Sequence, residues 1–269
     1  MKNKTIAIIG AGNLGLAIYD GLKKGGLLKE NKIILTKREV ESIDKYKSVG
    51  TTLTSDNKMA VQEADFVLLA VQPAQLAGVL DEVKPFLDSN KHTLISVVTA
   101  VEIKHIEAIV GSELAIVRAM PNTAVAVLES MTCISSNDAA RLKMIEVQTI
   151  FNCVGETLMI HEELMQSATV VCASGIAFWM RFIRATTQGG VQLGFDAEDA
   201  QHIAVQTCLG AASLLAKNGD HPEREIDKVT TPKGCTIAGL NEMEHNGLSS
   251  ALIKGLVTSF ERISSMKEL

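Results

Sequence analysis

The sequence predicts an α/β fold in which a doubly wound parallel sheet is followed by a domain made only of helices. Three observations predict it. Short apolar runs alternate with helix-length segments in the first part of the chain, a glycine-rich turn follows the first run, and the strand pattern stops after residue 160. We therefore expect one domain over 1–160 and a second over 161–269.

The first domain is expected to contain strands at 5–9, 33–35, 66–70, 93–96 and 115–117. These runs lack polar alternation, which is typical of strands buried on both faces of a parallel sheet. Helices are expected between them at 14–25, 58–64, 74–83 and 102–110, which favours right-handed βαβ crossovers. Two more strands, 131–134 and 156–160, are expected around a helix over 137–151.

The second domain shows only helical patterns. Asp196 is expected to cap a helix that ends at Asn218 and Gly219, because apolar residues repeat at helical spacing between them. Two more helices are expected over 236–245 and from residue 249 or 250 to the C-terminus. The uncharged stretch 164–180 is short for a membrane span, so we expect a buried helix there.

Composition excludes several classes of function. The 269 residues carry a net charge of −5 and only 4% aromatic residues, which disfavours nucleic-acid binding. Residues 1–4 show no signal-peptide pattern before the first expected strand, so we expect no signal peptide. The five cysteines are widely spaced without a CxxC pair, and the histidines lack metal-binding spacing. We therefore expect a cytoplasmic protein with no metal, no membrane partner and no nucleic-acid partner.

The glycine-rich turn has the G-x-G-x-x-G spacing of a Rossmann dinucleotide site. It places Gly10, Gly12 and Gly15 between the first strand and the first helix. In such turns the first glycine permits the tight turn, the second lets the backbone approach a pyrophosphate, and the third allows close helix–strand packing. An ordinary glycine turn is the alternative. The position after the first strand favours dinucleotide binding.

The end of the second strand indicates which dinucleotide is bound. An NAD site usually has an acid there, whereas this sequence has Thr36, Lys37 and Arg38. A guanidinium suits a 2′-phosphate, so the sequence favours NADP, with NAD as the weaker alternative. The alternative is that Lys37 and Arg38 are solvated surface cations that bind no cofactor.

Two longer motifs resemble those of the pyrroline-5-carboxylate reductase family. Residues 117–123 read Val-Arg-Ala-Met-Pro-Asn-Thr, and residues 227–240 are similar to the family's DKVTSPGGTTIAGL. Residues 70–73 correspond to the family's AVKP, and Asn57 corresponds to an asparagine at its adenosine site. The resemblance runs from about residue 5 to residue 266.

The resemblance implies an enzyme of proline biosynthesis that transfers hydride from NADPH to L-1-pyrroline-5-carboxylate and yields L-proline. It also implies a homodimer, or a larger homo-oligomer, that interlocks through the helical domains. The substrate would be held by a loop and by the start of the next helix, with Thr236 bonding near the substrate nitrogen. Thr236 acting only as a helix N-cap is the alternative.

The candidate site residues follow from the glycine turn, the second strand and the resemblance. The candidate cofactor-binding residues are Gly10, Ala11, Gly12, Asn13, Leu14, Gly15, Thr36, Lys37, Arg38, Asn57, Ala70, Val71, Gln72, Pro73, Val98 and Thr99. The candidate substrate-binding residues are Ser174, Thr231, Gly234, Cys235 and Thr236, and Thr236 is the candidate catalytic residue.

The sequence departs from the family pattern near the expected substrate site. Residues 166–178 lack the family's first glycine, proline and tyrosine, and Lys233 replaces a loop glycine. Two alternative functions therefore stay open. One is a related β-hydroxyacid dehydrogenase, although no lysine follows Gly175 closely. The other is a non-catalytic NADP-binding protein.

Overall fold

The computed structural model describes residues 1–266 and divides the chain into two compact units. Of the described residues, the first comprises Met1–Ser174 together with residues 260–266, and the second comprises Gly175–Ser259. The first unit is thus discontinuous in sequence. The sequence predicts a cofactor-binding domain over 1–160 and a helical domain for substrate and dimerisation over 161–269. This assignment of roles to the two domains stays a prediction.

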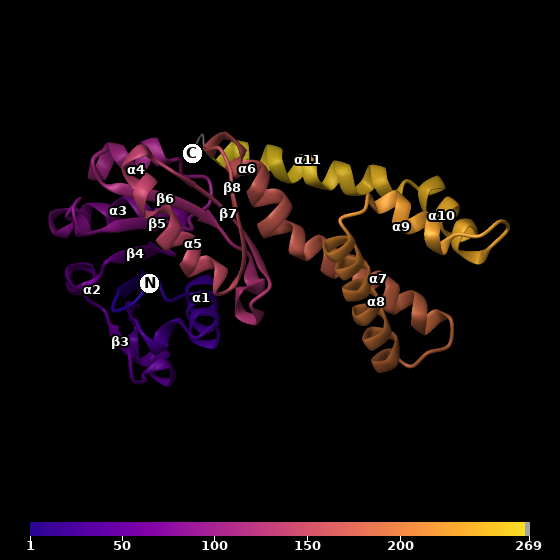
Figure 1. Ribbon diagram of the computed structural model, residues 1–269, viewed down its shortest axis with the longest axis horizontal. Coiled ribbons are helices and arrows are strands. Elements are labelled where there is room, and N and C mark those ends of the chain that lie inside the picture. Colours follow the sequence, from indigo (N-terminus) through magenta and orange to yellow (C-terminus); the bar gives the residue numbers. More distant parts are fainter. Residues whose placement is uncertain (267–269) are drawn as a thin grey trace. The chain divides into compact units, whose positions relative to one another are not determined.

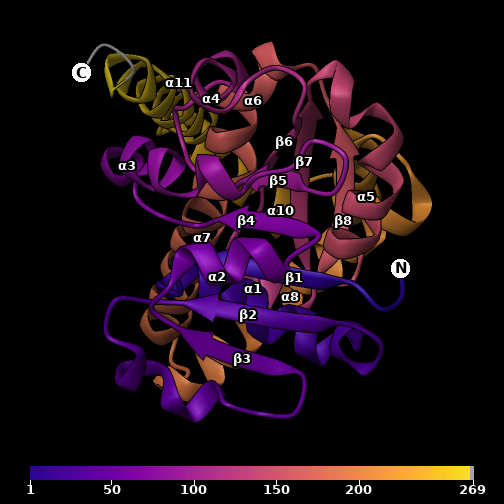
Figure 2. The same cartoon turned by 90° about the vertical axis from the view of Figure 1, so that its left-hand side faces the viewer.

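The first unit is built on an eight-stranded sheet in the order β3-β2-β1-β4-β5-β6-β7-β8, which can be followed in Figure 1 and Figure 2 together. All neighbouring strands run parallel except β6 and β7. The strands are β1 (Thr5–Ile9), β2 (Lys32–Thr36), β3 (Thr51–Thr54), β4 (Phe66–Leu69), β5 (Thr93–Ser96), β6 (Ala115–Met120), β7 (Ser130–Ser136) and β8 (Gly155–Met159). The predicted doubly wound α/β fold is confirmed.

Helices cover both faces of this sheet. The core on one face packs α1 (Asn13–Lys24) and α5 (Met144–Asn152) against side chains such as Ile6 and Ile8 of β1. The other face packs α2 (Asn57–Glu63), α3 (Pro73–Val83) and α4 (Ile103–Val110) against Ala7 and Ile9. Figure 2 shows this unit from the side of β2 and β3. Alternate residues of β1 therefore serve the two cores.

The predicted helices of the second unit are present. Asp196 caps α8 (Ala197–Asn218) by accepting 2.9 Å bonds from the amides of Glu198 and Asp199, and Gly219 ends the helix with φ of 66°. The predicted helices also include α10 (Cys235–His245) and α11 (Leu248–Met266), whose last part belongs to the first unit. A further helix, α9 (Pro222–Val229), was not predicted.

The stretch expected to be a buried helix is helical but only partly buried in the single chain, so this expectation is confirmed only in part. It comprises α6 (Met165–Ala168), a π-helical turn η7 (Thr169–Ser174) and the start of α7 (Gly175–Gln192). Met165 and Val170 are buried, whereas Val171 is exposed. Trp179 is 60% exposed. Within residues 1–266, Glu162–Gln192 is the one helical stretch long and apolar enough to cross a membrane, and 22% of its most apolar window is buried.

Candidate dinucleotide-binding site

A cavity of about 710 Å³ opens at the carboxyl ends of β1, β2 and β4 in the first unit. Here the strand order reverses between β1 and β4, which is where open α/β sheets bind their ligands. Ten of the predicted cofactor-binding residues line the cavity: Gly10, Ala11, Gly12, Thr36, Lys37, Arg38, Asn57, Ala70, Val71 and Gln72. The structure therefore brings together segments that are far apart in the sequence.

The three glycines of the turn have distinct surroundings. Gly10 has φ of +100°, a conformation that favours glycine. A Cβ on Gly15 would press against the carbonyl oxygen of Gly10, so this glycine serves close packing. A Cβ on Gly12 would meet nothing within 4 Å. The fold therefore has room for a side chain at Gly12, and the space above its backbone opens at the cavity.

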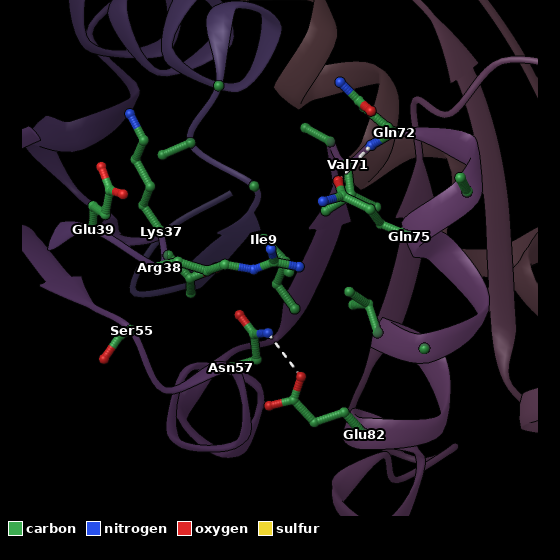
Figure 3. A pocket seen from close by; sticks show the side chains of 18 residues that line it. Ile9, Lys37, Arg38, Glu39, Ser55, Asn57, Val71, Gln72, Gln75 and Glu82 are labelled. Atoms are coloured by element: carbon green, nitrogen blue, oxygen red, sulfur yellow. Dashed lines mark hydrogen bonds between the residues drawn. The ribbon is translucent and has the colours of Figure 1, made fainter. Parts of the chain in front are cut away.

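The rim of the cavity at the end of β2 is charged. Arg38 is exposed and Lys37 is half-buried, and Figure 3 shows the Arg38 side chain extending into the cavity. Thr36 is only 2% exposed, and its carbonyl oxygen accepts a 2.8 Å hydrogen bond from the amide of Ala11. Thr36 thus helps to hold the glycine turn against β2, and the side chains of Lys37 and Arg38 line the cavity next to it.

Helix α3 supplies a wall of the cavity that the sequence analysis missed. Ala74, Gln75, Gly78, Val79 and Glu82 all line it. Their helical spacing places them on one face. The sequence contains this spacing, but the same pattern is typical of any helix that connects two parallel strands, so it did not indicate a cavity wall. Ile9, Glu39 and Ser55 line the cavity as well and were not predicted.

Six predicted cofactor-binding residues lie outside the cavity lining: Asn13, Leu14, Gly15, Pro73, Val98 and Thr99. Asn13 begins α1 and Pro73 begins α3. Leu14 packs against the core on one face of the sheet, and Val98 is 2% exposed in the core on the other face. Thr99 follows β5 and is half-buried. Their roles in cofactor binding stay predictions.

The substrate-loop candidates lie in the second unit, at the start of α10. Gly234 is the N-cap of this helix and makes no side-chain capping bond, while Cys235 and Thr236 are its first two residues. Thr236 is therefore not the N-cap of α10, so the alternative that Thr236 acts only as a helix N-cap is wrong. Its exposed hydroxyl has no hydrogen-bond partner among the described residues.

The loop before α10 keeps a glycine-like backbone despite its lysine. Lys233 has φ of 60°, in the left-handed region that favours glycine. The amide of Gly234 donates a 2.9 Å bond to the carbonyl of Thr231, which closes the turn. The conformation of the loop therefore does not depend on the missing glycine.

The remaining candidate, Ser174, ends the π-helical turn and is half-buried. This turn is joined to residues 117–123 because the Asn122 amide donates from Nδ2 to the Cys172 carbonyl oxygen at 3.2 Å. In the same segment, Arg118 is nearly buried and donates to Glu162 at 2.9 Å. Arg118 thus has a structural partner within the first unit.

The arrangement of metal-ligating side chains over residues 1–266 bears on the expectation of no metal. In residues 1–266, no group of three or more histidine, cysteine, aspartate or glutamate side chains is placed to hold a metal ion. The expectation that the protein needs no metal stays a prediction.

Comparison with known proteins places the chain in a family. Residues 162–266 match the family described as pyrroline-5-carboxylate reductase dimerisation, and residues 5–100 match NADP oxidoreductase coenzyme F420-dependent. The chain is 46% identical to pyrroline-5-carboxylate reductase 2 of Dictyostelium discoideum, over 98% of this chain and 93% of that protein. It belongs to the pyrroline-5-carboxylate reductase family. The resemblance stated from the motifs is confirmed.

Other relatives of the family agree. Pyrroline-5-carboxylate reductase 1 of Dictyostelium discoideum is 48% identical over 97% of this chain, which spans only 49% of that protein's length. The crystal structure of Plasmodium falciparum pyrroline carboxylate reductase with NADP bound aligns with a TM-score of 0.90, at 26% identity and 99% coverage of both chains. The Coxiella burnetii pyrroline-5-carboxylate reductase aligns with a TM-score of 0.89, at 30% identity and 98% coverage of both chains.

Proposed function

We propose that this chain reduces L-1-pyrroline-5-carboxylate to L-proline with NADPH, the last step of proline biosynthesis. The observation that carries the proposal is the cavity at the sheet edge, where an open backbone at Gly12 and the cations Lys37 and Arg38 line one space. Family membership supplies the substrate class, since the relatives are named for this reduction.

The residues of the cavity fit a phosphorylated dinucleotide. Backbone amides at the start of α1 suit a pyrophosphate, because the N-terminus of a helix favours anions. Lys37 and Arg38 suit a 2′-phosphate through charge-assisted hydrogen bonds. When bound, NADPH supplies the hydride. NADH is the weaker cofactor because it lacks the phosphate that the two cations would contact.

The imine substrate requires little acid–base chemistry from the protein. The ring nitrogen carries a proton in the iminium form, so the adjacent carbon is already electrophilic. Hydride adds to that carbon, the C=N π electrons pass to nitrogen, and the product amine retains the proton. The Thr236 hydroxyl would orient the ring through its nitrogen, and the amides at the start of α10 would bind the carboxylate.

A direct assay separates this function from the two alternatives. Purified protein and NADPH are mixed with L-1-pyrroline-5-carboxylate, and NADP⁺ is mixed with a panel of 3-hydroxyacids, while nicotinamide absorbance is followed. Oxidation of NADPH only with the imine supports the proposal. Turnover of a hydroxyacid favours a β-hydroxyacid dehydrogenase, and NADPH binding without turnover of any compound favours a non-catalytic protein.

We also propose that the chain works as a homodimer, or as a larger assembly of dimers, joined through its helical part. Large apolar side chains there are exposed in the single chain, among them Trp179 (60%), Leu193 (84%) and Ile253 (60%). An apolar surface of this kind marks an interaction site. Light scattering at micromolar concentration tests the proposal, and a monomer would contradict it. We further propose that the protein is cytoplasmic and has neither a membrane partner nor a nucleic-acid partner, in line with the expectation from its composition.

A further inference from the structure

Two cysteines that are distant in the sequence meet in the first unit. Cys133 lies in β7 and Cys172 lies in the π-helical turn η7, and their Sγ atoms are 3.5 Å apart. Both are free thiols. None of the remaining three cysteines has a sulfur contact of this kind among the described residues, and the Cys153 thiol instead donates to the carbonyl oxygen of Thr149.

The surroundings give the two sulfurs unequal access to solvent. Cys133 is 3% exposed and packs with Met120 and Met165 in a small apolar cluster. Cys172 packs at the edge of this cluster and is partly exposed. A small oxidant from solvent would therefore reach Cys172 first, with Cys133 directly behind it.

The contact between the thiols also makes Cys172 the better nucleophile. A hydrogen bond from the Cys133 thiol stabilises the Cys172 thiolate and lowers the pKa of Cys172 to about 7. The same contact, together with burial, raises the pKa of Cys133. When the pair loses a proton, the negative charge therefore resides on the accessible sulfur, Cys172.

We propose that Cys133 and Cys172 are a redox modification site, which hydrogen peroxide converts into an intramolecular disulfide. The Cys172 thiolate attacks one peroxide oxygen, the O–O bond breaks, and a sulfenic acid and hydroxide result. The Cys133 sulfur then attacks the Cys172 sulfur, the S–O bond breaks and the disulfide forms. In sum, two thiols lose two hydrogens and one peroxide becomes two waters.

The geometry requires only a short movement. A disulfide holds its sulfurs about 2.05 Å apart, so the pair must approach by about 1.5 Å from its 3.5 Å separation. The π-helical turn is the element able to shift, because β7 is held between β6 and β8. The proposed function is not needed for this chemistry.

The test uses the full chain and a readout other than turnover. Reduced protein is treated with hydrogen peroxide, remaining thiols are alkylated, and the digest is analysed by mass spectrometry with and without dithiothreitol. We expect one cross-linked peptide pair that contains Cys133 and Cys172, lighter by two hydrogens and lost on reduction. Cys208→Ser, which leaves the pair intact, is the matched control and should form the same cross-link.

Single substitutions assign the roles of the two sulfurs. Cys133→Ser should leave Cys172 as a sulfenic acid that dimedone traps, because no partner thiol remains. Cys172→Ser should leave Cys133 unoxidised under the same conditions. The proposal is overturned if the wild type accumulates dimedone-reactive Cys172 without the cross-link. It is equally overturned if both thiols stay alkylatable, or if the disulfide joins Cys172 of two separate chains on a non-reducing gel.

Discussion

Asn57 donates a 3.0 Å hydrogen bond from Nδ2 to Oε2 of Glu82, and this bond joins the start of α2 to α3 at the wall of the cavity. Figure 3 shows both side chains beside the space into which Arg38 extends. The bond holds the Asn57 amide in place, but it also puts a carboxylate where we propose that an anionic cofactor binds.

Glu82→Gln should therefore tighten NADPH binding. Glutamine keeps an oxygen to accept the Asn57 bond and removes the negative charge. We expect the Kd of NADPH to fall by about two- to fivefold at low salt, and by less at high salt, because partly exposed charges are screened. Titration by NADPH fluorescence measures it. Asp81→Asn removes the same charge from an exposed neighbour outside the cavity, so it should change the Kd little.

Gly12→Ala and Gly15→Ala should fail in different ways. The space around Gly12 accepts a Cβ, so the protein should stay folded, with a loss below about 1 kcal/mol at this helix start. NADPH binding should weaken at least about tenfold, because the Cβ occupies the approach of the pyrophosphate. Gly15→Ala forces a Cβ against the Gly10 carbonyl and should destabilise the fold by about 1–3 kcal/mol. Thermal melting and Kd together separate the two, and normal NADPH binding by Gly12→Ala would contradict the site.

Arg38→Ala with Lys37→Ala should weaken NADPH far more than NADH. The two side chains contribute charge-assisted hydrogen bonds, each worth roughly 1.5–3 kcal/mol before the discount for their exposure. We expect about a tenfold or larger rise in the Kd of NADPH and a small change for NADH. Lys24→Ala with Lys47→Ala removes two exposed cations outside the cavity lining and serves as control. Equal losses for both cofactors would refute the assignment.

Thr236→Ala should lower activity without lowering stability. Its hydroxyl makes no capping bond, since Gly234 occupies the N-cap, so the melting temperature should stay within about 1 °C. We expect kcat/KM for the imine to fall by about 10–100-fold, while the Kd of NADPH stays the same. Thr236→Ser keeps the hydroxyl and should retain most activity. A Thr236→Ala enzyme with wild-type turnover would remove Thr236 from the catalytic assignment.

Much of the sheet was predictable because its strands are continuous apolar runs. β3 was missed because Thr51–Thr54 is short and polar for a strand, and it lies at the edge of the sheet. α9 was missed because Pro222–Val229 is short and mostly charged, and Ile226 and Val229 form only a narrow apolar stripe, although Pro222 at its first position is a helix-start signal. Periodicity also cannot reveal the π-helical turn, whose extra residue per turn depends on tertiary packing.

The candidate site shows the same division. The glycine turn and the cations after β2 follow local patterns that are legible in one sequence. Glu82 was not predictable, because its place beside Asn57 depends on how α3 packs next to α2, a relation across 25 residues of chain. The capping state of Thr236 likewise depended on where α10 begins, and helix ends are the least predictable part of an element.

The discontinuity of the first unit has a consequence for the order in which the protein is made. The Gln166 amide donates from Nε2 to the Phe260 carbonyl oxygen at 2.9 Å and also bonds the Ser264 hydroxyl, 94 and 98 residues later in the chain. On the ribosome, β1 to β8 are complete well before residues 260–266 are synthesised. Gln166 therefore lacks these partners until the second unit has been synthesised, so the first unit completes its packing only after the second unit has been made.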